Sequence, residues 1–285
     1  MKHRIRRSAH TNVFSIILIG AGGTGAEVLR GLAKIALAAR ELHQIAVRVT
    51  VMDGDRVSRA NLVRQPFTAG DIGRNKAECL VNRYNLWAGL NFRACPEMFA
   101  AGKALPASPS GAIDLVVSCV DNAATRAALH QHFRRSPPRY WLDCGNLART
   151  GQVVLGEPRQ EHARDWYGRL PTVTELFPEL LDPRRTEPDL PSCSLAEALE
   201  RQDLLVNEAI GLAAKQLVWQ LVSAEELAWH GAFVDLASGR TVSLPVDAAG
   251  WKRFGHRGAR KPPERKNVSQ RPVAHIPQPE RRRLH

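Results

Sequence analysis

Hydrophobic residues along the first 156 positions alternate between two spacings. Short apolar runs of strand length are separated by stretches in which apolar residues recur every three or four positions, as in a helix with one buried face. The expected strands are FSIILI (14–19), AVRVTVMD (46–53), a weaker FRACPEMF (92–99), DLVVSCVD (114–121), YWLDCGN (140–146) and TGQVVLG (150–156). The expected helices are AEVLRGLAKIALAAR (26–40), DIGRNKAECLVNRYNLW (71–87) and NAATRAALHQHF (122–133).

This alternation predicts an α/β fold, a Rossmann-like doubly wound sheet with mainly parallel strands. In such sheets the loops at the carboxyl ends of the strands meet in one crevice, where ligands bind. Polar or glycine-rich residues follow three of the expected strands: GAGGTG at 20–25, Asp53 with Asp55, and Asp121 with Asn122. We therefore expect these segments to converge on one site.

The pattern changes after residue 156. Residues 157–194 contain six prolines and no sustained period, which is typical of a functional loop or a disordered segment. A long apolar helix is expected over 195–222, with a break near Gln202 and Asp203, and a hairpin over 231–246 turns at 237–239. The hairpin closes the folded body as a C-terminal extension.

The formal net charge of +12 lies at the two ends of the chain. Residues 1–10 contain four basic residues and no acid, and residues 251–285 contain eleven Lys and Arg against two Glu. The C-terminal segment is also rich in proline and poor in large apolar residues, so we expect a disordered basic tail. The alternative is an electrostatic arm that binds nucleic acid or an acidic partner.

No window approaches eighteen uninterrupted apolar residues, so no membrane segment is expected. The basic N-terminus leads into a glycine loop rather than a cleavage site, which favours a first strand and a cytoplasmic protein. The five cysteines include no CxxC pair and indicate reduced thiols rather than a disulfide framework or a tetrathiolate zinc site. They are Cys79, Cys95, Cys119, Cys144 and Cys193.

GAGGTG has the spacing of a phosphate-binding loop, because Gly20, Gly22 and Gly25 open a helix directly after a strand. Glycines there permit a tight turn and a close approach of the backbone to phosphates, and the N–H groups at a helix N-terminus favour anions. Asp53 ends the next strand, where a carboxylate suits the hydroxyl groups of a ribose. A purely structural turn is the alternative for the loop.

The segment after Asp53 is unusually polar for a dinucleotide site. Arg64 and Lys76 add cations suited to a triphosphate, and Asn61 and Gln65 add neutral donors. A carboxylate at the end of the run 114–121 suits a magnesium ion that bridges phosphates. Solvated loop charges are the structural alternative.

Four segments together resemble the ThiF, MoeB and ubiquitin-activating-enzyme superfamily: GAGGTG, D-G-D-x-V-x-x-x-N-L-x-R-Q (53–65), D-I-G-x-x-K-A (71–77) and S-C-V-D-N-x-x-x-R (118–126). The resemblance covers about residues 16–156 and extends to about residue 245. PSCSLAEALERQDLLVNEAIGLA and the basic tail further resemble the ThiF-type proteins of the PRTRC cassette.

The resemblance implies that Mg·ATP adenylates the C-terminal glycine of a ubiquitin-like or sulfur-carrier protein. Arg64, Lys76 and Asp121 would act in catalysis, with Asp121 binding magnesium. The nucleotide would contact Gly20, Gly22, Gly23, Gly25, Asp53, Asp55, Asn61, Arg64, Gln65, Lys76, Asp121 and Asn122. Cys193 would accept the activated carrier as a thioester, and its place before a helix would lower the pKa of the thiol. An incidental thiol is the alternative for Cys193.

Two departures from the family pattern bear on cofactors and partners. Relatives hold a structural zinc with two CxxC pairs, so no zinc is expected here. In the family, an arginine of an N-terminal RxxRQ motif reaches across the dimer interface to the partner's ATP, and this chain has no obvious equivalent. Arg4, Arg6 or Arg7 would have to take its place. The alternative is that these arginines only form a solvated basic end. A homodimer remains the default, together with a small ubiquitin-like carrier and a conjugating-enzyme-like partner.

These expectations divide the chain into a basic N-terminal arm (1–12), an ATP-binding adenylation region (13–156), a crossover-type loop with the candidate cysteine (157–196), a C-terminal helix and hairpin completing the same domain (197–250), and the basic tail (251–285). Three competing functions remain open. They are a tRNA-modifying adenylating relative served by the tail, a non-catalytic nucleotide-binding scaffold, and an NAD-dependent oxidoreductase, which the cationic cluster disfavours.

Overall fold

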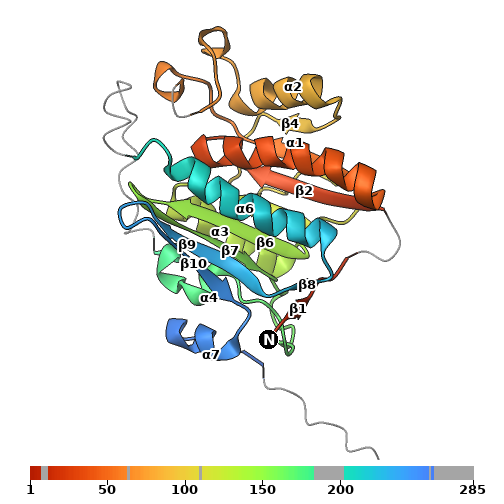
Figure 1. The fold of residues 1–285 in the computed structure, drawn as a ribbon, viewed down its shortest axis with the longest axis vertical. Coiled ribbons are helices and arrows are strands. Elements are labelled where there is room, and N and C mark those ends of the chain that lie inside the picture. The colour runs from red at the N-terminus through yellow and green to blue at the C-terminus, as the bar shows by residue number, and fades with distance from the viewer. Residues whose placement is uncertain (8–11, 63–64, 109–110, 183–201, 257, 260–285) are drawn as a thin grey trace, which may run out of the picture.

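A computed structural model describes residues 1–7, 12–62, 65–108, 111–182, 202–256 and 258–259. In these residues eight strands form one sheet in the order β10-β9-β7-β6-β5-β2-β3-β4 (Figure 1). Their bounds are β2 Val13–Ile19, β3 Ala46–Met52, β4 Arg93–Cys95, β5 Leu115–Ser118, β6 Tyr140–Asn146, β7 Thr150–Gly156, β9 Trp229–Asp235 and β10 Arg240–Pro245. A second, two-stranded sheet pairs β1 (His3–Arg4) with β8 (Glu226–Leu227).

The large sheet has a parallel half and an antiparallel half. Strands β4, β3, β2, β5 and β6 pair in parallel, whereas β7, β9 and β10 continue the sheet from β6 with antiparallel pairing. This confirms a Rossmann-like α/β fold, and the hairpin predicted over 231–246 forms β9 and β10. The parallel half brings the carboxyl ends of β2, β3, β5 and β6 to one edge of the sheet.

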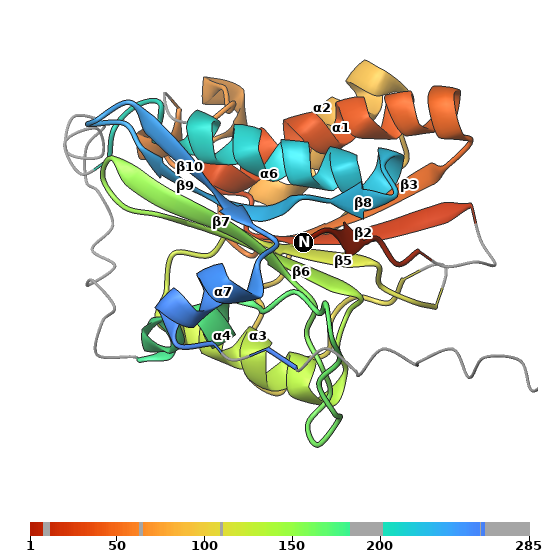
Figure 2. The ribbon, with the colours of Figure 1, turned by 60° about the horizontal axis from the view of Figure 1, so that its bottom comes forward.

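Helices cover both faces of the sheet. Figure 2 shows α1 (Gly23–His43) and α6 (Val206–Ser223) on one face, and α3 (Ala123–Arg135), α4 (Val173–Leu176) and α7 (Ala248–Trp251) on the other. Helix α2 (Lys76–Ala88) packs beside α1 near β4. None of the helices in the described ranges is long and apolar enough to cross a membrane.

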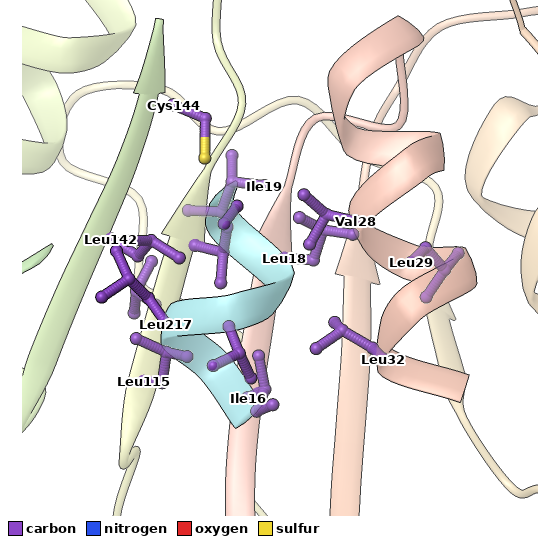
Figure 3. Packing of buried hydrophobic residues seen from close by; sticks show 14 of the residues in the cluster. Ile16, Leu18, Ile19, Val28, Leu29, Leu32, Leu115, Leu142, Cys144 and Leu217 are labelled. Atoms are coloured by element: carbon purple, nitrogen blue, oxygen red, sulfur yellow. The ribbon is translucent and has the colours of Figure 1, made fainter. Parts of the chain in front are cut away.

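The main core lies between the sheet and the pair α1 and α6. Ile16 and Leu18 on β2 are buried between Val28 and Leu32 of α1 and Leu217 of α6 (Figure 3). Helix α1 is buried on most of its circumference, because it packs against β3, α2 and α6 and so removes its hydrocarbon from water. This packing fixes the glycine loop at the end of β2.

Several elements have bounds that differ from the sequence prediction, including α2, which begins at Lys76 and not at Asp71. Strand β5 ends at Ser118 rather than at 121, because Asn122 already caps α3 by accepting a hydrogen bond from the Thr125 N–H. The weak strand over 92–99 shortens to β4, which Pro96 follows with no N–H to donate. Helix α6 starts at Val206, after the predicted break, and residues 195–201 lie outside the described ranges.

Residues 157–182 contain more structure than their irregular pattern indicates. Thr172 and Glu175 form a capping box at α4, and Leu170, Val173 and Leu176 are buried. A 3-10 turn follows at Pro178–Leu181. The prolines and the lack of hydrophobic periodicity therefore gave no sign of this short, well-packed segment. It covers part of the sheet face opposite α1.

Residues 1–7 and 251–256, which were expected to belong to basic end segments, pack onto the body of the protein. Arg6 forms an ion pair with the buried Glu157, and the Arg7 guanidinium donates to the carbonyls of Leu221 and Ala224. The expected tail boundary at 251 falls inside an ordered element, since the Trp251 indole is buried and its N–H donates to His230 Nε2 at 2.8 Å. Burial lowers the pKa of His230 to about 4, so this imidazole is neutral at pH 7.

Candidate functional site

A cavity of about 660 Å³ opens at the carboxyl ends of β2, β3, β5 and β6. Its volume lies within the range of small-molecule sites. The predicted site residues that line it are Gly20, Gly22, Gly23, Asp53, Asp55, Asn61, Gln65, Lys76, Asp121 and Asn122. Arg64 and Cys193 lie outside the described residues. Segments far apart in the sequence thus meet at the crevice that the strand pattern predicts.

Three positions of the loop are occupied by glycine for three different structural reasons. Gly20 has a φ of +91°, and a Cβ there would lie 2.4 Å from the Cys119 carbonyl oxygen. A Cβ on Gly25 would lie 1.9 Å from the Gly20 carbonyl oxygen, so Gly25 permits α1 to start against the strand end. At Gly22 a Cβ would meet nothing within 4 Å. Gly22 is therefore the position where a ligand can approach the backbone.

Gly23 is small for another reason. A Cβ on Gly23 would lie 2.5 Å from Nδ2 of Asn207, a residue in the first turn of α6. The sequence predicts a nucleotide contact at Gly23, which does line the cavity. The structure adds that its missing side chain leaves room for Asn207.

Asp53 is buried at the end of β3 and contacts the glycine loop directly. Its Oδ2 accepts a hydrogen bond from the Ala21 N–H at 2.5 Å, and its Oδ1 accepts from the Asp55 N–H at 2.8 Å. Burial raises the pKa of Asp53, although these two hydrogen bonds oppose the shift. Asn75 supports the same turn by donating from Nδ2 to the carbonyls of Asp53 and Asp55.

Lys76 and Asp55 form an ion pair inside the cavity. Lys76 Nζ lies 2.9 Å from Asp55 Oδ2, and the lysine side chain is 11% exposed whereas the aspartate is 53% exposed. Ala77, Leu80 and Val81 of α2 are buried in the core, whereas Lys76 at the start of the helix lines the cavity. An incoming anion would therefore compete with Asp55 for this ammonium.

Asn61 and Gln65 stand in the polar segment after β3. Asn61 Oδ1 accepts from the Ser58 N–H at 2.9 Å, which closes the 3-10 turn Arg59–Asn61. Gln65 Oε1 is buried with no hydrogen-bond partner among the described residues. A buried amide oxygen without a partner costs free energy, so its position in the cavity is consistent with a ligand donor.

Asp121 and Asn122 form the wall opposite Asp53. Asp121 is exposed in the cavity, and Asn122 caps α3. In the described ranges no group of three or more His, Cys, Asp or Glu side chains is arranged to bind a metal ion. A metal at Asp121 would therefore need oxygens from a ligand such as a phosphate.

The sequence matches the ThiF family over residues 8–241. The chain belongs to the ThiF family. Ubiquitin-like modifier-activating enzyme 5 of Xenopus laevis is 26% identical over an alignment of 161 residues, and the match covers 51% of this chain and 37% of that protein. The protein of the same name from Culex quinquefasciatus is 27% identical over an alignment of 130 residues, and the match covers 41% of this chain and 30% of that protein. This chain thus matches about a third of each relative's length.

Solved structures share the fold of this ThiF-family protein. Escherichia coli MccB superposes with a TM-score of 0.53 at 14% identity, over 82% of this chain and 64% of that chain. PaaA superposes with a TM-score of 0.52 at 11% identity, again over 82% of this chain and 64% of that chain. MccB structures were determined with ATP, and with AMPCPP and MccA.

The ThiF-family site rests on a buried polar network around Asp143, a residue that the sequence analysis did not identify. Asp143 on β6 is fully buried and accepts from Arg126 Nε at 3.2 Å and from the Ser118 hydroxyl at 2.7 Å. Arg126 also donates to the Val120 carbonyl at 3.0 Å. These bonds fix the loop that presents Asp121. The available signal was an acidic residue inside the apolar run YWLDCGN.

The described cysteines are free thiols. Cys79 and Cys144 are buried, as expected for packing residues, whereas Cys119 is half-buried and lines the cavity beside Cys144. A hydrogen bond with Cys119, together with burial, raises the pKa of Cys144 well above its ordinary value. Cys144 is therefore not a thiolate nucleophile at pH 7.

Proposed function

We propose that this protein uses Mg·ATP to adenylate the C-terminal glycine of a small ubiquitin-like or sulfur-carrier protein. One observation carries the proposal: the open backbone at Gly22 and the Lys76–Asp55 pair line the same cavity. Backbone N–H groups at a helix N-terminus and a nearby cation are groups that bind phosphates. Family membership and the ATP complexes of MccB support the same reading.

In this proposal each wall of the cavity contacts one part of ATP. The glycine loop surrounds the phosphates, and Asp53 accepts hydrogen bonds from the ribose hydroxyls. Both oxygens of Asp53 already accept a backbone N–H, yet each carboxylate oxygen has a second lone pair for a ribose hydroxyl. Lys76 exchanges Asp55 for phosphate oxygens, and Arg64 adds a second cation. Asn61 and Gln65 orient the chain of phosphates.

The reaction requires positioning more than a nucleophile from the protein. A carboxylate oxygen of the carrier attacks the α-phosphorus, the bond to the bridging α,β-oxygen breaks, and pyrophosphate leaves with that electron pair. The residues of this chain align the two reactants and stabilise the charge that develops on the phosphates. Magnesium, when bound by Asp121 and the phosphates, would neutralise further negative charge.

A second step on Cys193 completes the proposal. The Cys193 thiolate would attack the carbonyl carbon of the acyl adenylate, form a thioester and release AMP. A homodimer, a conjugating-enzyme-like acceptor, nucleic-acid binding by the basic tail and the absence of zinc remain predictions. Cys193→Ala should preserve adenylation and remove only a reducible or base-labile carrier adduct. An adduct that persists in this variant contradicts the role of Cys193.

Exchange of labelled pyrophosphate into ATP tests the adenylation step. Small proteins that end in glycine, taken from neighbouring genes, should each be added to the wild-type protein and to Asp121→Ala. We expect exchange that depends on one such carrier and is abolished by Asp121→Ala. Absence of exchange with every such carrier contradicts the proposed function.

A further inference from the structure

Asn207 joins four segments of the chain through one side-chain amide. It is 3% exposed, and its Oδ1 accepts from the Thr24 hydroxyl at 2.9 Å and from Asn146 Nδ2 at 3.0 Å. Its Nδ2 donates to Gln202 Oε1 at 3.2 Å. Thr24 lies in the first turn of α1, Asn146 ends β6 and Gln202 precedes α6, and all four residues line the cavity.

The backbone next to this amide is shaped to receive it. Gly23 has no Cβ where one would overlap the Asn207 amide, and Gly211, one turn along α6, leaves room for the side chain of Glu27 on α1. The two helices therefore approach closely along one side of the glycine loop, as Figure 1 shows for their parallel course. A neutral amide fills the gap and contacts the first turn of α1 without adding charge beside its N-terminus.

We propose that Asn207 is a positioning residue for phosphate binding, and this inference rests on the proposed function. Its Oδ1 fixes the Thr24 hydroxyl and thereby the first turn of α1, so the backbone N–H groups near Gly22 point into the cavity before ATP arrives. An ordered donor set loses less conformational freedom on binding and stabilises an anion better than a mobile one. The amide also ties this turn to Asn146 and Gln202, which face the cavity from other segments.

Titration calorimetry with Mg·ATP alone tests the inference without a carrier. Asn207→Ala and Thr24→Val should each weaken the affinity for Mg·ATP about tenfold. Thr24→Ser keeps the hydroxyl and should bind as the wild type does. The double variant Thr24→Val, Asn207→Ala should bind no more weakly than the weaker single variant, because both changes remove the same contact.

Asn207→Asp separates positioning from structural support. The carboxylate keeps both acceptor contacts and places negative charge near the N-terminus of α1, where the helix dipole favours it. Its second oxygen cannot donate to Gln202 Oε1, so the Gln202 amide has to turn and donate from Nε2. We expect this variant to lose more Mg·ATP affinity than Asn207→Ala while its melting temperature falls less.

The outcomes distinguish the inference from the function on which it rests. A wild-type protein that does not bind Mg·ATP overturns both. A wild-type protein that binds, with Asn207→Ala and Thr24→Val binding equally well and only melting earlier, overturns the role of Asn207 alone. Equal affinity of Thr24→Ser and Thr24→Val also contradicts the inference, because the hydroxyl would then be irrelevant.

Discussion

Backbone contacts shape the glycine-loop wall of the cavity (residues 20–25), whereas charged and amide side chains shape the adjoining wall after β3 (residues 53–62 and 65–76). In the first wall, Gly20 and Gly25 fit against carbonyl oxygens with no room for a methyl group. In the second, Lys76 is paired with Asp55, and Gln65 Oε1 is buried without a partner among the described residues.

This difference indicates two separate tasks for the two walls. A wall set by backbone has its shape before the ligand arrives and fails when one atom is added. In a wall built on an ion pair, the cation has to exchange its carboxylate partner for phosphate oxygens when the ligand enters. Loss of the charge should therefore abolish binding, whereas small changes of side-chain shape should be tolerated. The following variants test this division, in order of decreasing effect.

Gly25→Ala should have the largest effect. Its Cβ would overlap the Gly20 carbonyl oxygen, and overpacking of this kind costs about 3 kcal/mol of unfolding free energy. Gly22→Ala is the matched control, because its Cβ meets nothing within 4 Å. Chemical denaturation should show a loss within about 1 kcal/mol for Gly22→Ala, while its Mg·ATP affinity falls. Equal stability of the two variants would contradict the backbone-fitted wall.

Lys76→Met should lower the rate of pyrophosphate exchange about 100-fold, because one stabilising donor is lost from the developing charge. The melting temperature should change little, since the exposed partner Asp55 makes the pair weak in the folded state. Asp55→Asn should change exchange less than Lys76→Met, because it leaves the ammonium in place. A larger loss in Asp55→Asn would show that the pair itself, rather than the cation, is needed.

The wall after β3 should also lose stability in acid through Asp71. Burial alone would raise the pKa of Asp71, but hydrogen bonds from Thr68 and Arg83 outweigh it and lower the pKa to about 2. A carboxylate with a lowered pKa stabilises the folded state above about pH 4, and this contribution is lost as the pH falls toward 2. Asp71→Asn should therefore cost about 2 kcal/mol at pH 7.

Denaturation at pH 7 and at pH 2 measures this contribution. The cost of Asp71→Asn should be mostly lost at the lower pH, because Asp71 is then about half protonated in the folded wild type and almost fully protonated in the unfolded chain. A cost that is equal at both pH values would assign the effect to lost packing instead.

Gln65→Leu should have the smallest effect of the four main substitutions in this series. It removes a buried oxygen that has no partner in the described residues, so the unfolding free energy should stay equal or rise. The affinity for Mg·ATP should fall about tenfold if the amide contacts the ligand. Calorimetry that shows unchanged affinity would remove Gln65 from the nucleotide site.

The sequence predicted those parts of the site that depend on local pattern. The strand, glycine turn and helix around Gly22, and the acid at the end of β3, follow from spacing within one segment. Asn207 and Asp143 were missed because their roles depend on which segments meet in the folded chain. Trp251 was assigned to the tail because the sequence that follows it is basic and rich in proline. That pattern gives no sign that the Trp251 indole packs against His230.

Under the proposed function, this cavity directs attack on the α-phosphorus of ATP. Incubation of the protein, a glycine-terminated carrier and magnesium with ATP labelled at the α- or the γ-phosphate tests it most directly. We predict that the α-label appears on the carrier as an acid-stable, base-labile adenylate and that the γ-label appears in pyrophosphate. Release of the γ-label as inorganic phosphate, with no α-label on the carrier, would contradict the account.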